Sequence, residues 1–169
     1  MGFGEITPRT LSMRFAVTGE ALIGLGIVTA SVSWIVLLYP ALSRMRLLAL
    51  QTALLSELSM GAGPPLGSRH QLYQLAEKVQ RIHIDLIYFP ILYYFRANHH
   101  KSSLASTFPA LIRFSEEATA GDDRDKFSAR TLRLAVEDIA SLLRRRFLGP
   151  GPEDLHSVLE SFAKNHGEL

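Results

Sequence analysis

The feature that most constrains this chain is a stretch of 23 residues, Ala21 to Ser43, that contains no charged side chain. A helix needs about 20 apolar residues to cross the hydrocarbon core of a bilayer. A signal peptide has a charged start and a shorter apolar core, whereas this stretch begins late and continues through Trp34 and Leu38. We therefore predict one transmembrane helix near the N-terminus and expect that it is not cleaved.

Composition argues against several functional classes. The chain has 18 Lys and Arg against 16 Asp and Glu, so its net charge of +2 offers no broad basic surface, and we expect no nucleic-acid partner. It has no cysteine, which excludes disulfides, thiolate metal sites and cysteine nucleophiles and is compatible with a reducing compartment. The sequence contains no phosphate-binding glycine loop and no nucleophile elbow. We expect neither an enzyme nor a cofactor.

Beyond the apolar stretch the patterns predict helices only, so the expected fold class is all-α. Leucines such as Leu48 and Leu55 prolong the first helix until GAGPPLG, and residues 61–68 are the predicted linker. A second helix is expected over 69–95, bent or divided by Pro90. Further helices are expected over 104–118 and 131–148, and a last one carries the stripe Leu155, Val158, Leu159 and Phe162, with Gly167 just past its end.

The segment from Ile82 to Phe95 is apolar but has only 14 residues and includes His83 and Asp85. It is too short and too polar for a second membrane span, so we predict a buried core segment. Its aromatic residues are predicted core residues: Phe89, Tyr93, Tyr94 and Phe95.

The residues before the predicted span suit an ion filter. In a potassium filter an extended backbone points carbonyl oxygens at the pore axis, which requires glycines around a bracing aromatic residue. Gly2, Phe3 and Gly4 supply that alternation, Glu5 would attract cations at the outer mouth, and Pro8 would end the loop.

Together with the span that follows, this segment resembles a known family: residues 1 to about 43 are similar to the selectivity filter and inner helix of potassium channels, including bacterial two-helix and two-pore-domain channels. The family filter reads Thr-Val-Gly-Tyr/Phe-Gly-Asp. Gly2, Phe3 and Gly4 match its central triplet, Glu5 replaces the acidic residue, and Met1 takes the place of the valine. The threonine, the pore helix and the outer membrane helix are absent from this sequence, so we expect a C-terminal fragment that begins at an internal methionine.

The resemblance implies a membrane topology and a division of the chain into three segments. The filter would face outside and the inner helix would descend into the cytoplasm, which agrees with Arg44 and Arg46 after the span. Residues 1–10 would be the filter remnant and outer-mouth loop, 11–43 the transmembrane inner helix, and 44–169 a cytoplasmic helical domain of a protein in the cell membrane.

The resemblance also implies how the protein works. Potassium would be the permeant ion, and the chain would form a homo-oligomer: a tetramer if the full chain has one filter, a dimer if it has two. Gly24 lies 20 residues beyond Gly4 and is the candidate gating hinge. The alternative role for Gly24 is close packing between membrane helices.

Two other functional classes stay open. The first is a single-span membrane-anchored signalling or scaffold protein, in which Met1 is the true start. The second is a membrane-tethered enzyme, for which His83-x-Asp85 and the pair His99-His100 are the only metal or acid–base candidates; neither has the spacing of a known motif. Arg144 to Arg146 are predicted to form the solvated end of a helix, with lipid headgroup binding as the alternative.

Overall fold

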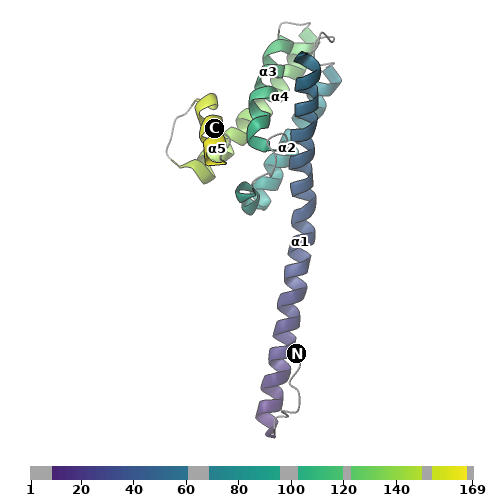
Figure 1. Ribbon diagram of the computed structural model, residues 1–169, viewed down its shortest axis with the longest axis vertical. Coiled ribbons are helices and arrows are strands. Elements are labelled where there is room, and N and C mark those ends of the chain that lie inside the picture. Colours follow the sequence, from purple (N-terminus) through teal and green to yellow (C-terminus); the bar gives the residue numbers. More distant parts are fainter. Residues whose placement is uncertain (1–8, 61–68, 96–102, 120–122, 150–153, 167–169) are drawn as a thin grey trace. The chain divides into compact units, whose positions relative to one another are not determined.

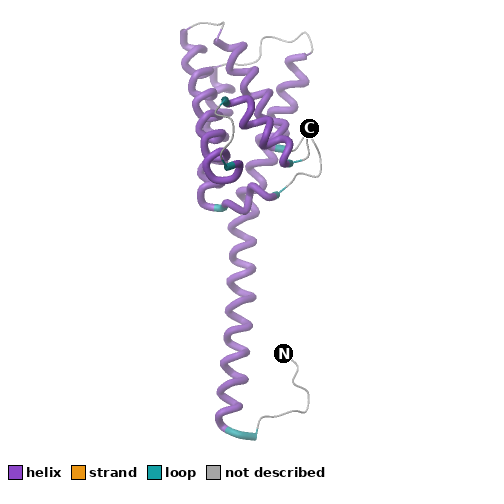
Figure 2. Tube along the Cα trace, turned by 90° about the vertical axis from the view of Figure 1, so that its left-hand side faces the viewer, coloured by secondary structure: helices purple, strands orange, loops and turns teal. Residues whose placement is uncertain are grey.

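The computed structural model describes the chain except for residues 1–8, 61–68, 96–102, 120–122, 150–153 and 167–169. All elements in the described part are helices, with no strand among them (Figure 2). The expected all-α fold class is therefore confirmed for this part of the chain. The predicted linker at 61–68 lies outside the described residues.

The first helix, α1 (Leu11–Met60), is 50 residues long and contains the whole predicted span. It is the one helix in the described part of the chain that is long and apolar enough to cross a membrane. Pro40 lies inside it. The chain divides into two compact units, Met1–Pro40 and Ala41–Leu169, so the division falls within α1, at this proline. Proline removes one backbone donor, which makes this a natural point of bending in a continuous helix.

The second unit contains the remaining elements. They are α2 (Arg69–Tyr88), the 3₁₀ helix η1 (Pro90–Tyr94), α3 (Leu104–Thr119), α4 (Asp123–Leu143), the π-helical turn η3 (Arg144–Leu148) and α5 (Leu155–Asn165). As predicted, Pro90 ends the second helix: it is the first residue of η1, a position at which its missing N–H leaves no bond unmade.

The fourth helix begins eight residues earlier than the sequence predicted, at Asp123 and not at Thr131. The prediction followed an apolar stripe that starts at Leu132. Among residues 126–130 the buried side chains are the small ones of Ser128 and Ala129, while Phe127 is 70% exposed. Small buried residues give no hydrophobic signal, which explains the error at this boundary.

Within the second unit four helices pack as a bundle of alternating direction. The Lys78 Nζ donates to Gln51 Oε1 over 2.6 Å, and Arg44 reaches Asp85, so α2 runs antiparallel to the end of α1. The α2 and α3 helices both pack against α4, and α5 lies against the ends of α3 and α4 (Figure 1). Helices of alternating direction joined by short connections are typical of four-helix bundles.

The bundle core is made of fully buried aliphatic and aromatic residues from all four helices. They include Leu48, Leu72, Val79, Ile82, Leu86, Phe108, Leu111, Phe114, Leu132, Ile139 and Leu143. From α1, residues at three-and-four spacing enter this core: Ala41, Met45, Leu48 and Thr52. Most of the leucines that indicated the helix lie on its opposite face and are exposed, namely Leu47, Leu50, Leu54 and Leu58.

The prediction that the aromatic residues near Pro90 are all buried is wrong. Tyr93 is 8% exposed, but Tyr94 is 72% and Phe95 is 43% exposed. A 3₁₀ helix has three residues per turn, so only one side of η1 can face the bundle at a time. Tyr93 and Leu92 occupy that side, and their neighbours point outward.

Candidate functional site

The predicted filter residues Gly2, Phe3, Gly4 and Glu5 lie outside the described residues. What the structure describes is the helix that follows them. The filter assignment therefore stays a prediction from the sequence.

The candidate hinge, Gly24, lies within α1 and is partly exposed. Apart from its chain neighbours and the backbone of its own helix, a methyl group added at Gly24, Gly19 or Gly26 would meet no atom of the described chain within 4 Å. Close packing within this chain therefore does not require glycine at these positions. The two roles that remain for Gly24 are backbone bending and contact with another chain.

Three hydroxyl groups in the predicted span donate to carbonyl oxygens of their own helix. Thr29 donates to the Leu25 carbonyl oxygen over 2.8 Å, and Ser31 and Ser33 donate one turn back in the same way over 2.8 Å. Polar groups without partners cost several kcal/mol in hydrocarbon. These bonds allow α1 to carry hydroxyl residues and still be compatible with a bilayer.

The first charged residue after the span, Arg44, is fixed to α2. Its Nε donates to Asp85 Oδ2 and its Nη2 donates to Asp85 Oδ1, both over 2.8 Å. The Asp85 side chain is 12% exposed and that of Arg44 is 42% exposed. The hydrogen bonds to Asp85 raise the pKa of Arg44 above its usual value. Burial of the guanidinium acts in the opposite direction and lowers the pKa, while the negative charge of Asp85 raises it further. Arg44 therefore stays cationic, in the two-pronged geometry that guanidinium and carboxylate groups favour.

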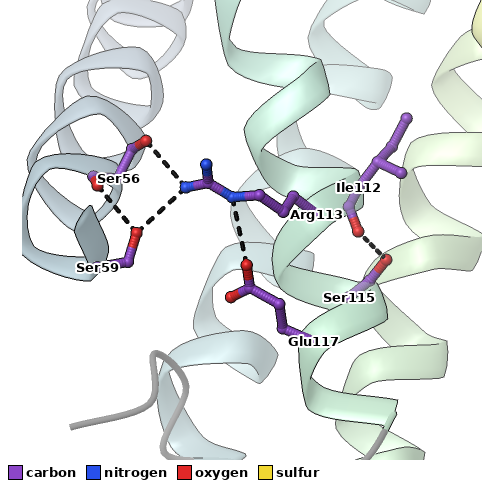
Figure 3. Close-up of polar contacts among 6 residues, drawn as sticks. All are labelled: Ser56, Ser59, Ile112, Arg113, Ser115 and Glu117. Atoms are coloured by element: carbon purple, nitrogen blue, oxygen red, sulfur yellow. Dashed lines mark hydrogen bonds and ion pairs between the residues drawn. The ribbon is translucent and has the colours of Figure 1, made fainter.

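A second polar contact joins α1 to α3 (Figure 3). The Arg113 Nη2 donates to the Oγ atoms of Ser56 and Ser59, each over 3.1 Å. The Arg113 Nε lies 3.4 Å from Glu117 Oε1, a charge contact without an aligned hydrogen bond. One guanidinium therefore connects two helices through two hydroxyls and is balanced by a carboxylate on its own helix.

A third cluster attaches α5 to η1. The ring of Tyr93 stacks in parallel on Phe147 with centroids 4.3 Å apart, and Asn165 Nδ2 donates to Tyr93 Oη over 3.3 Å. The His166 Nε2 lies 2.7 Å from the carbonyl oxygen of Tyr93, and its Nδ1 lies 2.9 Å from that of Phe162. A carbonyl oxygen only accepts and a neutral imidazole has one N–H, so His166 can donate to either of these oxygens; the bond to Tyr93 attaches the end of α5 to η1.

The other polar candidates do not converge. Asp85 is bound to Arg44, and the structure shows no bond between it and His83. The pair His99-His100 lies outside the described residues. Within the described part of the chain no three His, Asp or Glu residues are placed to hold a metal ion.

The triple arginine lies at the end of α4, as predicted, in the π-helical turn η3. The Arg146 Nη1 donates to the carbonyl oxygen of Ile87 over 3.1 Å, which ties this turn to the end of α2.

No family model, curated protein or solved structure matches this chain.

The sequence did not indicate the partners of Arg44 and Arg113. These residues lie 41 and 54 to 57 positions from their partners, so no local spacing relates them. The only local signal was the charge of Asp85 within an otherwise apolar segment, because a buried carboxylate needs a cationic partner.

Proposed function

We propose that this chain is part of the pore-forming subunit of a potassium-selective channel, which conducts potassium passively across the cell membrane. The observation that carries the proposal is the order Gly2-Phe3-Gly4-Glu5 immediately before α1, a helix long and apolar enough to span a bilayer. Carbonyl oxygens of the three filter residues would replace part of the hydration shell of the ion. No cofactor takes part.

The contact between Arg44 and Asp85 supports a link between the bundle and the pore. Arg44 follows the apolar stretch directly, and two short hydrogen bonds hold it to α2. In the proposed channel the bundle is cytoplasmic, and a movement of α2 pulls on the inner end of the pore-lining helix. Bending at Gly24 would then open that end.

The exposed leucines of α1 support a homo-oligomer. A potassium filter needs four filter strands, so one chain cannot form it alone. Leu47, Leu50, Leu54 and Leu58 are 51%, 46%, 60% and 68% exposed and recur at the three-and-four spacing of one helical stripe. This outer leucine stripe offers a surface on which α1 helices of different subunits pack, in a tetramer or, with two filters per chain, a dimer.

The alternative is a single-span membrane-anchored scaffold or signalling protein. The same apolar helix and the same outer leucine stripe favour it if Gly-Phe-Gly is coincidental, because both features suit an anchored bundle that binds a partner helix. The two proposals differ in one property, ion conduction.

Potassium and sodium flux in liposomes tests the proposal. The protein is the gene product expressed from its natural start, with Gly2→Ala and Gly4→Ala as filter variants. Gly19→Ala is the matched control, because a methyl group there meets no neighbouring atom within 4 Å. Potassium-selective flux that is lost in both filter variants and kept in the control supports the channel. Folded protein without flux refutes it and leaves the anchored bundle.

A further inference from the structure

The C-terminal end of α2 and the η1 helix that follows it expose many apolar side chains. Between residues 84 and 95 six large apolar side chains are exposed: Ile84, Ile87, Tyr88, Ile91, Tyr94 and Phe95, with Tyr88 at 74% and Tyr94 at 72%. Single exposed apolar residues are normal on protein surfaces, but a contiguous group marks a contact site. We refer to these six residues as the apolar α2–η1 surface.

The register between α1 and α2 shows which residues of α1 lie beside this surface. Arg44 lies seven residues before Gln51 on α1. Their partners run the other way, because Asp85 lies seven residues after Lys78 on α2. The two bonded pairs thus define one antiparallel register. Three residues further along α2, Tyr88 is level with Ala41, which belongs to the uncharged stretch.

That level coincides with the boundary of a membrane. Charged side chains are costly in hydrocarbon, so the hydrocarbon core ends before Arg44. The headgroup region adds about 5 to 7 Å on each side, roughly one helical turn. Tyr88 and the η1 helix that follows are therefore placed where the apolar interior meets the headgroups.

The side chains at this level are those that suit the interface. Tyrosine is enriched there because its ring is apolar while its hydroxyl remains hydrogen-bonded to water or headgroups. The exposed guanidinium of Arg146 also lies here, bonded to the Ile87 carbonyl oxygen, and a cation at this depth attracts anionic headgroups.

The buried residues of η1 fix the position of this surface on the bundle. Leu92 is fully buried, and Tyr93 stacks on Phe147 and contacts His166 in the bundle. With these two inner residues fixed, η1 presents Ile91 and Tyr94 outward without a further ordering cost.

We propose that the apolar α2–η1 surface is inserted in the headgroup region of the bilayer, as a second membrane contact of this chain. The occupant of this surface is lipid, and Tyr88, Tyr94 and Phe95 are the inserted side chains. The contact holds whether or not the protein conducts potassium, because it follows from the span and the helix register alone. It ties the bundle to the membrane surface at the point where Arg44 joins α1 to α2.

Spin labels on single cysteines test this depth, because the natural chain has no cysteine. Tyr88→Cys and Tyr94→Cys are the test variants. Tyr73→Cys is the matched control: it is the same residue type on the same helix, 54% exposed, and roughly 22 Å from Tyr88 at 1.5 Å per residue. The full chain is reconstituted in phosphatidylcholine and phosphatidylglycerol vesicles, and collision rates with oxygen and with a water-soluble nickel complex are measured.

We expect a higher ratio of oxygen to nickel collisions at positions 88 and 94 than at position 73. Equal ratios at all three positions would overturn the proposal, because the surface would then face water. Protection of position 88 from both reagents would also overturn it, since a protein partner or a second copy would then cover the surface. Circular dichroism of each variant confirms that the helices are intact, and all three positions are exposed, so loss of the fold is not expected.

Discussion

Arg44 and Asp85 face each other across two helices, joined by two parallel hydrogen bonds of 2.8 Å. The carboxylate is nearly buried while the guanidinium remains half exposed. Asp85 therefore depends on Arg44 for its charge balance more than Arg44 depends on Asp85. The pair lies where α1 leaves the uncharged stretch, and it joins α1 to α2 within the second unit.

Arg44→Met is expected to lower the free energy of unfolding by about 1.5–3 kcal/mol, because it leaves the buried Asp85 carboxylate without its charged partner. Adding Asp85→Leu should recover part of the loss, since both charges are then gone. Urea unfolding of the full chain in detergent, followed by circular dichroism, measures both effects.

The matched control for this pair is the exposed pair of Glu77 and Arg81 on α2, whose side chains are 50% and 63% exposed. Arg81→Met should cost no more than about 0.5 kcal/mol. An equal loss in Arg81→Met and Arg44→Met would contradict the special role of the pair between α1 and α2.

Leu132→Ala is expected to destabilise the bundle by about 2–5 kcal/mol, because Leu132 is fully buried between the helices and its truncation leaves a cavity. Leu134→Ala is the control: the residue lies on the same helix but is 52% exposed, so the change should stay within about 0.5 kcal/mol. Thermal unfolding of both variants compares them, and similar losses would show that α4 is rotated from the position described.

Arg113→Lys is expected to destabilise the bundle by about 1 kcal/mol although the charge is kept. The two serines of α1 accept from one flat guanidinium, and an ammonium group at the end of a flexible chain does not reproduce this geometry (Figure 3). The double variant Ser56→Ala/Ser59→Ala removes the acceptors. If the lysine substitution costs as much in that background as in the natural chain, the serines are not what Arg113 recognises.

Gly24→Ala is expected to leave the fold intact, because a methyl group at this position meets no described side chain within 4 Å apart from its chain neighbours. Alanine also favours a helix by about 1 kcal/mol over glycine. If Gly24 is the hinge of a channel, the same change stiffens α1 and lowers the open probability. Single-channel recording of the gene product expressed from its natural start measures this, with Gly26→Ala as the control. An unchanged open probability would remove Gly24 as the hinge.

Leu50→Ser combined with Leu54→Ser is expected to shift the protein toward smaller assemblies without unfolding it. Both side chains lie on the outer leucine stripe and are 46% and 60% exposed, so neither belongs to the buried core of a single chain. Light scattering with size-exclusion chromatography in detergent reports the mass of the assembly, and Leu134→Ser serves as the exposed control. An unchanged mass would mean that the stripe is not a subunit contact.

The sequence by itself determined the helical class, the position of the apolar span and the break at Pro90. Each of these depends on a short window: the absence of charge over 23 residues, the three-and-four spacing of apolar residues, or the missing backbone donor of one proline. The beginning of α4 was misplaced for the same reason, because the turns around Ser128 and Ala129 bury side chains too small to register as an apolar pattern.

Only the tertiary structure decided which side chains face inward near Pro90 and which residues join the helices. Tyr93 and Tyr94 are neighbours of the same type, yet one is buried against Phe147 and the other is exposed, because η1 can turn only one side to the bundle. Arg44 finds Asp85 across 41 positions of sequence. Contacts of this kind depend on how whole helices pack in space, and no local pattern of residues encodes that arrangement.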